Sequence, residues 1–337
     1  MRAVRIWLCV VLGFIALMVA VGGITRLTES GLSMVEWRPL IGALPPLDER
    51  AWHDVFAKYQ QTPQYTLVNH WMQLEDFKRI FFWEYIHRLL GRLLGLVFAV
   101  PWLVFVARGQ VRGPLLRATG IALLLGAAQG GLGWLMVMSG LVDRPAVSHY
   151  RLAAHLGLAF GVALWVLWII LSLSPAPEQR ASRSFRRHAV VTLGLLLTQV
   201  VYGAFMAGKR AGLVSSTFPD MNGQFGPSGF VRSAGGLFSD PVAIHWVHRT
   251  LAWLVLGAFA WLWWRARREP LPIRKAALAT ALITSVQVGL GALTVVYYVP
   301  ISVAVIHQQV ALVLLCATFF LIFRAGAVAP LRLTAAA

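Results

Sequence analysis

Residues 84–91 have the sequence EYIHRLLG, and residues 245–252 have the sequence HWVHRTLA. Both stretches place His-Arg at their fourth and fifth positions, and both open a long apolar segment. Two matched segments of this kind in one apolar chain are typical of an internal structural repeat. Further matching motifs around these two stretches can therefore show where each half of the chain begins and ends.

The match continues in the same order along both halves. Residues 129–133 have the sequence QGGLG and residues 287–291 have QVGLG, while His155 and His307 each precede an apolar run. Each half then contains four long apolar segments. Because four is an even number, the second half enters the membrane from the same side as the first. The halves are predicted to be parallel repeats related by an axis along the membrane normal.

The composition is that of a membrane protein. Of the 337 residues, 58% are hydrophobic and 13% are charged, whereas soluble domains carry about 25% charged residues. Apolar runs long enough to cross a bilayer recur along the chain, which excludes soluble, disordered, coiled-coil and fibrous classes. We predict an all-α polytopic membrane protein whose eight transmembrane helices form two tandem, parallel-related four-helix bundles. The expected spans are 6–24, 82–106, 115–138, 149–172, 188–208, 242–264, 276–298 and 302–323.

The net charge of +17 does not indicate nucleic-acid binding, because the arginines lie mainly in short connectors between apolar runs. Charge in such connectors sets orientation in a membrane. Most Lys and Arg residues fall on the side that also holds both termini, so the positive-inside rule predicts cytoplasmic termini. No clear cleavage site follows the first span and no transit peptide precedes it, which favours a retained helix in a bacterial inner membrane.

Polar segments mark the expected domain boundaries. The N-terminal four-helix half is predicted at residues 1–174 and the C-terminal half at residues 188–337. A cytoplasmic linker at 175–187, which contains two prolines, joins them.

Two outer loops are long for simple connections, and loops of such length are usually functional or disordered. In the first loop, at 25–81, residues 47–60 and 70–81 have amphipathic patterns that predict short helices on the membrane face. Residues 209–241 are rich in Gly, Ser and Pro and predict an irregular loop.

The two cysteines, Cys9 and Cys316, lie far apart inside apolar runs. This spacing excludes covalent haem attachment, an iron–sulfur cluster, a thiol zinc site and a disulfide framework. Both residues are expected to be small buried hydrophobic side chains.

Four of the nine histidines fall one or two turns inside the outer ends of the even-numbered spans: His87, His155, His248 and His307. Ionisable groups are costly inside a bilayer and indicate function by default. Two imidazoles on facing helices of a four-helix bundle can supply both axial ligands of a haem iron. The pattern predicts two haem sites, His87 with His155 and His248 with His307.

Other interpretations of these histidines remain open. Each could instead form an interhelical hydrogen bond, whereas a closed zinc site is disfavoured because two histidines without thiol or carboxylate partners are too few. A di-haem electron-transfer subunit would need the same four histidines, and a repeat-built transporter would use them as a proton relay. The roles of His149 and His245 stay open as well.

Arginines accompany the histidines in a pattern that suits haem propionates. Arg88 and Arg249 directly follow His87 and His248, and Arg151 precedes His155 by one turn. Arginine binds carboxylates through a bidentate fork. The alternative for such residues is an arginine snorkelling to the interface, and for Arg92 this alternative is favoured.

Glu84 breaks the symmetry between the halves. It shares a helix face with His87 and Arg88, and the corresponding position in the second half is His245. A carboxylate beside one haem and not the other suggests different tasks. Glu84 could take a proton or stabilise a developing cation, or it could simply pair with Arg88.

These motifs resemble those of the haem A synthase family. The resemblance rests on GGITRLTESGLSM at residues 22–34, followed by Trp37, Pro39, Gly42 and Pro45-Pro46, and on the ExxH pattern of residues 84–87. The eight spans, the tandem repeat and one histidine pair per half agree with it. In one branch of the family, the first outer loop carries a pair of cysteines. This sequence has no cysteine in that loop and so resembles the alphaproteobacterial and mitochondrial branch.

The resemblance implies a membrane oxidoreductase that converts the C8 methyl of haem O to a formyl group, giving haem A for terminal oxidases. It implies that His87 and His155 hold haem O or haem A, that His248 and His307 hold a haem b that relays electrons, and that Glu84 is catalytic. Expected partners are haem O, membrane lipids, haem O synthase and terminal oxidase assembly factors. A homo-oligomer is compatible with the sequence.

Overall fold

The computed structural model describes residues 1–36, 44–142, 145–175, 179–226 and 236–332, and this part of the chain is helical without a named β-strand. Eight of its helices are long and apolar enough to cross a membrane, which confirms the predicted fold class. Their bounds are α1 Arg2–Leu27, α3 Leu74–Ala107, α4 Gly113–Val142, α5 His149–Ser172, α6 Arg183–Lys209, α8 Pro241–Ala266, α9 Leu271–Val296 and α10 Ile301–Arg324.

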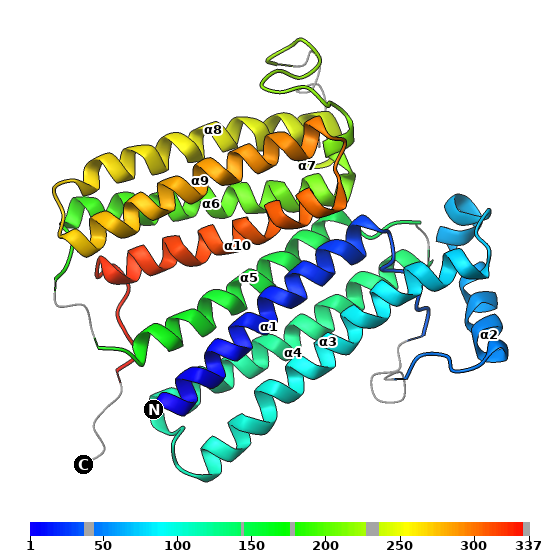
Figure 1. The fold of residues 1–337 in the computed structure, drawn as a ribbon, viewed down its shortest axis with the longest axis horizontal. Coiled ribbons are helices and arrows are strands. Elements are labelled where there is room, and N and C mark those ends of the chain that lie inside the picture. Colours follow the sequence, from blue (N-terminus) through cyan, green and yellow to red (C-terminus); the bar gives the residue numbers. More distant parts are fainter. Residues whose placement is uncertain (37–43, 143–144, 176–178, 227–235, 333–337) are drawn as a thin grey trace.

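The long helices lie in two groups of four that follow chain order (Figure 1). In the first group α1 packs against α3 and α5, and α4 packs against α5; in the second α6 packs against α8 and α10, and α9 packs against α8 and α10. Helices α1, α5, α6 and α10 form the contact between the groups. The main core follows these four helices, with Leu8, Ile169, Phe185 and Leu315 fully buried.

The two groups of helices differ in how closely two of their helices pack together. Helices α8 and α9 pack closely against each other, whereas α3 and α4 touch much less. Only 6% of the most apolar window of α3 is buried, and the same holds for α4, compared with 33% for α8 and 17% for α9. The first group therefore presents a looser flank between α3 and α4.

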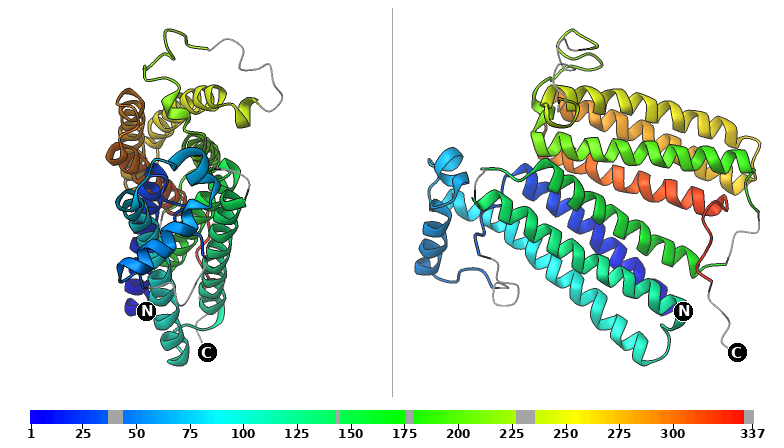
Figure 2. Two further views of the ribbon diagram at one scale, coloured as in Figure 1. Left: turned by 90° about the vertical axis from the view of Figure 1, so that its right-hand side faces the viewer. Right: turned by 180° about the vertical axis from the view of Figure 1, so that it is seen from behind.

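Both long loops lie at the same end of the helices, which we call the long-loop end; the first long loop is residues 28–73 and the second is residues 210–240 (Figure 2). The first contains α2 (Glu49–Gln60) and a π-helical turn, Tyr65–Asn69. The second contains a 3₁₀ turn, Ala211–Leu213, and α7 (Gly236–Ser239). The predicted irregular loop is thus largely correct, although residues 227–235 lie outside the described part.

An aromatic core joins α2 to the start of α3. Tyr59 and Phe77 are fully buried and stack with ring centroids 5.1 Å apart. The Tyr59 hydroxyl donates to Gln64 and accepts from Asn69, and burial raises the pKa of Tyr59 to about 12. The amphipathic helix predicted at 47–60 is confirmed.

The separate short helix predicted at 70–81 is wrong, because α3 begins at Leu74 and continues without interruption to Ala107. The Asp76 carboxylate accepts from the backbone N–H of Gln73 and so caps the helix start. No Gly or Pro follows until Gly91, so nothing breaks the helix at the membrane boundary.

The expectation for the cysteines is also partly wrong. Cys9 is exposed and Cys316 is partly buried. The buried face of α1 runs through Val4, Leu8 and Val11, and Cys9 is turned about 100° away from Leu8 on the helix.

Candidate functional site

The four predicted histidines occupy equivalent positions, and each ring lies against a glycine of a neighbouring helix. A Cβ added at Gly22 on α1 would lie 3.0 Å from Cε1 of His87 on α3. An added Cβ would likewise lie close to the Cε1 atom of the other three rings. The distance is 3.1 Å from Gly133 to His155, 3.3 Å from Gly203 to His248 and 3.0 Å from Gly291 to His307. A methyl group at any of these positions would press on the ring, which would have to shift by a few tenths of an ångström, so the glycines allow the imidazoles to approach the neighbouring helices closely.

Three of the rings also lie beside a glutamine, four residues before the corresponding glycine. The Gln129 Nε2 is 3.2 Å from Nδ1 of His155 and donates to its backbone carbonyl at 3.0 Å. The Gln199 Nε2 donates to the His248 carbonyl at 3.0 Å and is 3.5 Å from the ring Nε2. The Gln287 Nε2 is 3.4 Å from Nε2 of His307.

Two of these Gln–Gly pairs were noted from the sequence as repeat markers, whereas the pair Gln199 and Gly203 was missed. Gly22 was noted only as part of the motif at residues 22–34, without its contact to His87. The signal that could have found Gln199 is the shared spacing Gln-x-x-x-Gly, present at 129–133, 199–203 and 287–291.

His87 on α3 and His155 on α5 belong to the first group of helices, and His248 on α8 and His307 on α10 belong to the second. Their pairing at a shared metal stays a prediction. The Nδ1 atoms of His87, His248 and His307 are buried without a hydrogen-bond partner among the described residues. Two partly buried imidazoles with available ring nitrogens suit an iron that takes its other four ligands from a porphyrin. Within the described ranges no three His, Cys, Asp or Glu residues form a metal-binding group.

Glu84 lies under the first long loop and is only 2% exposed. Its Oε2 accepts from the Ser33 hydroxyl at 2.7 Å and from the Met34 backbone N–H at 2.8 Å. Its Oε1 pairs with Arg88 at 2.5 Å, and Arg88 also donates to the carbonyls of Met34 and Glu36. The Glu84–Arg88 pair considered from the sequence is thus present, and a chemical role for Glu84 stays a prediction.

The second half repeats this arrangement with a histidine in place of the carboxylate. His245 is 2% exposed, and its Nε2 is 3.0 Å from Arg249 Nη2. Arg249 donates to the carbonyls of Pro219 and Asp220 in the second long loop. Hydrogen bonds from the Thr217 hydroxyl and the Gly223 backbone N–H lower the pKa of Asp220 below its usual value. In both halves, the arginine after the histidine donates to backbone carbonyls of a long loop and so joins that loop to the helix that carries the histidine.

The remaining candidates have protein partners too. Arg151 is exposed and donates to the Leu135 carbonyl on α4 at 2.7 Å. His149 is 2.8 Å from the Phe238 carbonyl and packs against Phe205, which links α5, α6 and α7. Propionate binding by Arg88, Arg151 and Arg249 stays a prediction.

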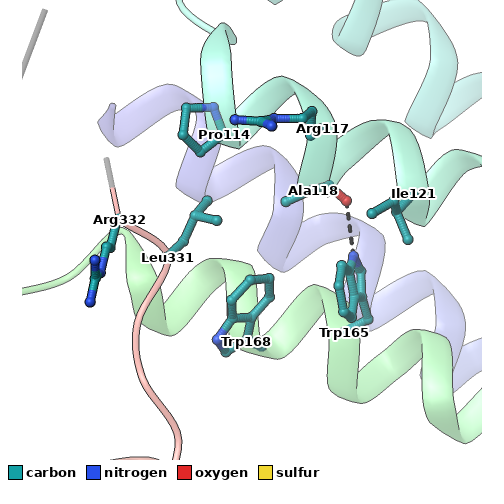
Figure 3. Close-up of a pocket in the computed structure, with 8 residues that line it drawn as sticks. All are labelled: Pro114, Arg117, Ala118, Ile121, Trp165, Trp168, Leu331 and Arg332. Atoms are coloured by element: carbon teal, nitrogen blue, oxygen red, sulfur yellow. Dashed lines mark hydrogen bonds between the residues drawn. The ribbon is translucent and has the colours of Figure 1, made fainter. Parts of the chain in front are cut away.

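A shallow cavity of about 310 Å³ lies at the opposite end of the first group, between α4, α5 and the segment after α10 (Figure 3). Trp165 closes one side by donating to the Ala118 carbonyl at 2.9 Å. Trp165 follows His155 by nearly three helical turns, about 15 Å along α5. This cavity is therefore separate from the histidine site. Its lining residues are Pro114, Arg117, Ala118, Ile121, Trp165, Trp168, Leu331 and Arg332.

Comparison with known proteins identifies the family. A family profile described as "Cytochrome oxidase assembly protein" matches residues 5–319. A protein of Nitrosospira multiformis named "Heme A synthase" is 43% identical over 329 residues, covering 95% of this chain and 92% of that protein. The chain belongs to the haem A synthase family.

Other haem A synthases match equally well. That of Bradyrhizobium sp. strain BTAi1 is 43% identical over 343 residues, covering 99% of this chain and 94% of its own. That of Rhodospirillum centenum is 45% identical over 322 residues, covering 93% and 86% respectively. Membership of the haem A synthase family confirms the resemblance and the expectation of a membrane oxidoreductase. Assignment to the cysteine-lacking branch stays a prediction.

Proposed function

We propose that this protein oxidises the C8 methyl of haem O to a formyl group and so supplies haem A for terminal oxidase assembly. The observation that carries the proposal is the placement of four imidazoles, two in each group of helices and each set against a glycine, in a chain 43% identical to haem A synthases over nearly its whole length. Such pairs match the axial ligand requirement of two porphyrins.

The halves have different tasks in this proposal. His87 and His155, in the half 1–174, hold the substrate haem O or the product haem A. His248 and His307, in the half 188–337, hold a haem b, which when bound would relay electrons. The buried carboxylate of Glu84 on the helix of the first pair and the buried imidazole of His245 on the helix of the second support this division. The looser flank between α3 and α4 suits a substrate with a long apolar tail that enters and leaves sideways.

The residues around the first pair position the substrate and exclude water. Ser33, Met34 and Arg88 hold Glu84 in one orientation, from which it takes a proton or stabilises positive charge as the methyl is oxidised. The guanidinium groups of Arg88, Arg151 and Arg249 lie at the end of the bundle where they attract propionates.

The same proposal places the protein in a bacterial inner membrane with both termini in the cytoplasm. The long-loop end then faces outward, so the haem pairs lie in the outer half of the bilayer. Haem O synthase and terminal oxidase assembly factors are its expected partners, because they supply the substrate and use the product.

Pigment analysis tests the function. The full-length protein is purified from cells that make haem O, and the extracted porphyrins are identified by chromatography and mass spectrometry. We expect haem O or haem A together with haem b. Recovery of haem b alone would favour a di-haem electron-transfer subunit, and a folded preparation without porphyrin would contradict both functions.

A further inference from the structure

The four helices that carry the glycines share a second position, four residues earlier. On α4, α6 and α9 this position holds Gln129, Gln199 and Gln287, each beside the histidine of the neighbouring helix. On α1 the same spacing from Gly22 leads to Met18. The repeat partner of Met18 is Gln199, so the first half has one such glutamine where the second half has two.

Met18 cannot replace the glutamine amide. Its thioether has no N–H to donate, and its methyl carbon lies 3.8 Å from the position of a Cβ at Gly91 on α3, one turn beyond His87. The Gly22 contact therefore fixes the His87 ring from one side, but no glutamine lies beside this ring in the described structure.

A second departure from the repeat lies at the same place. Glu84, where the second half has His245, is one turn from His87 on α3. Both changes surround one histidine of the four, while the surroundings of His155, His248 and His307 keep a common pattern. The two departures from the repeat, Met18 and Glu84, thus both lie where α1 packs against α3.

We propose that Gln129, Gln199 and Gln287 are positioning residues for their histidines, and that Met18 leaves His87 as the exchangeable axial ligand. The inference rests on the proposed function. Residues that orient a metal-binding histidine commonly contribute about 10–100-fold to metal affinity, and each glutamine amide contacts the ring or the backbone carbonyl of its histidine. A resident haem gains from two fixed ligands, whereas a substrate haem must be taken up and released, which one weaker ligand permits.

The test exchanges the repeat-related residues in the full-length protein purified with its own haems. The variants are Met18→Gln and Gln199→Met, and Leu17→Gln is the control because Leu17 is exposed and adjacent to Met18. The readout is carbon monoxide binding after reduction, followed by difference spectra. Carbon monoxide binds ferrous haem when a histidine leaves the iron, and haem A, whose formyl group is conjugated with the ring, is spectrally distinct from haem b.

We expect wild-type protein to bind carbon monoxide at the first-half haem and not at haem b. Met18→Gln should lower the carbon monoxide affinity of the first-half haem by about tenfold or more, Leu17→Gln should leave it unchanged, and Gln199→Met should make haem b reactive. Gln287→Met serves as a second variant of that kind if Gln199→Met does not fold.

Unreactive wild-type haem, or carbon monoxide binding that none of the exchanges alters, would overturn the inference. Failure of the proposed function is recognised separately, because the extracted pigment would then be haem b alone. In that case the fraction of haem b that binds carbon monoxide in the Met18→Gln, Leu17→Gln and Gln199→Met proteins would still show whether the glutamines and Met18 have the proposed effect.

Discussion

At the scale of single residues, Glu84 could act in the chemistry of the site or serve only to hold the first long loop in place. It is buried, and its two oxygens accept three hydrogen bonds from Ser33, Met34 and Arg88. Removing one partner of a buried ion pair commonly costs about 3–5 kcal/mol. A substitution at Glu84 therefore has to separate a chemical role from the fastening of the first long loop.

We predict that Glu84→Ala keeps haem b but lowers formyl production by about a hundredfold or more, the usual contribution of a proton-transferring group. Glu84→Gln, which keeps an oxygen for Ser33 and Met34, should fail in the same way if charge or proton transfer is required. Haem A yield in cells and pigment content of the purified variants are the measurements. An unchanged yield of haem A in both variants would remove Glu84 from the mechanism.

At this scale the sequence singled out the ionisable residues and gave no role to several of their neutral neighbours. The four histidines were found because charge-bearing side chains are rare in apolar spans. Ser33 and Gln199 were missed because their importance depends on which helix or loop lies beside them. That neighbour is set by packing, which the one-dimensional pattern does not contain.

At the scale of helices, the site depends on close approach between helix pairs. Gly291 on α9 lies against the His307 ring, whereas Gly289, two residues earlier, has open space around its Cβ position. Small residues allow such approach between membrane helices. The two glycines thus form a matched pair for testing whether the contact positions the ligand.

We predict that Gly291→Val displaces His307 and depletes haem b, while Gly289→Val retains it. Substitution of a residue that orients a metal ligand typically costs about 10–100-fold in metal affinity. Haem b per protein, measured as the pyridine haemochrome, is the readout. Equal haem b content in the two variants would show that the glycine contact does not hold the ring.

The helices themselves were predictable because length and apolarity define a membrane span. All eight spans were located within a few residues except where α3 extends outward to Leu74. The error at 70–81 has a physical cause, since an amphipathic pattern does not reveal whether a helix lies on the surface or continues into the bilayer. Here the aromatic core around Phe77 holds the extension upright.

At the scale of the whole molecule, α1 connects the two histidine pairs. Gly22 lies against His87 of the first half, and the next residue, Gly23, lies against Gln308, the neighbour of His307 in the second half. Gln308 donates to the Val19 carbonyl at 2.7 Å. Adjacent residues of one helix thus contact both sites, although the histidines belong to separate groups of helices.

We predict that Gly23→Leu destabilises the protein by about 1–3 kcal/mol, the usual cost of overpacking, because the new side chain collides with Gln308 between the halves. Gly13→Leu is the control, since Gly13 has no atom within 4 Å of its Cβ position. Thermal unfolding in detergent compares the two variants. A Gly23→Leu protein as stable as the control would mean that α1 and α10 are not tightly joined.

The most direct test of paired imidazoles in separate halves is the pigment content of His155→Ala and His307→Ala proteins, purified alongside wild type. The account predicts that His307→Ala loses haem b and keeps haem O or haem A, and that His155→Ala shows the opposite loss. Depletion of the same pigment by both substitutions, or of neither pigment by either one, would contradict it.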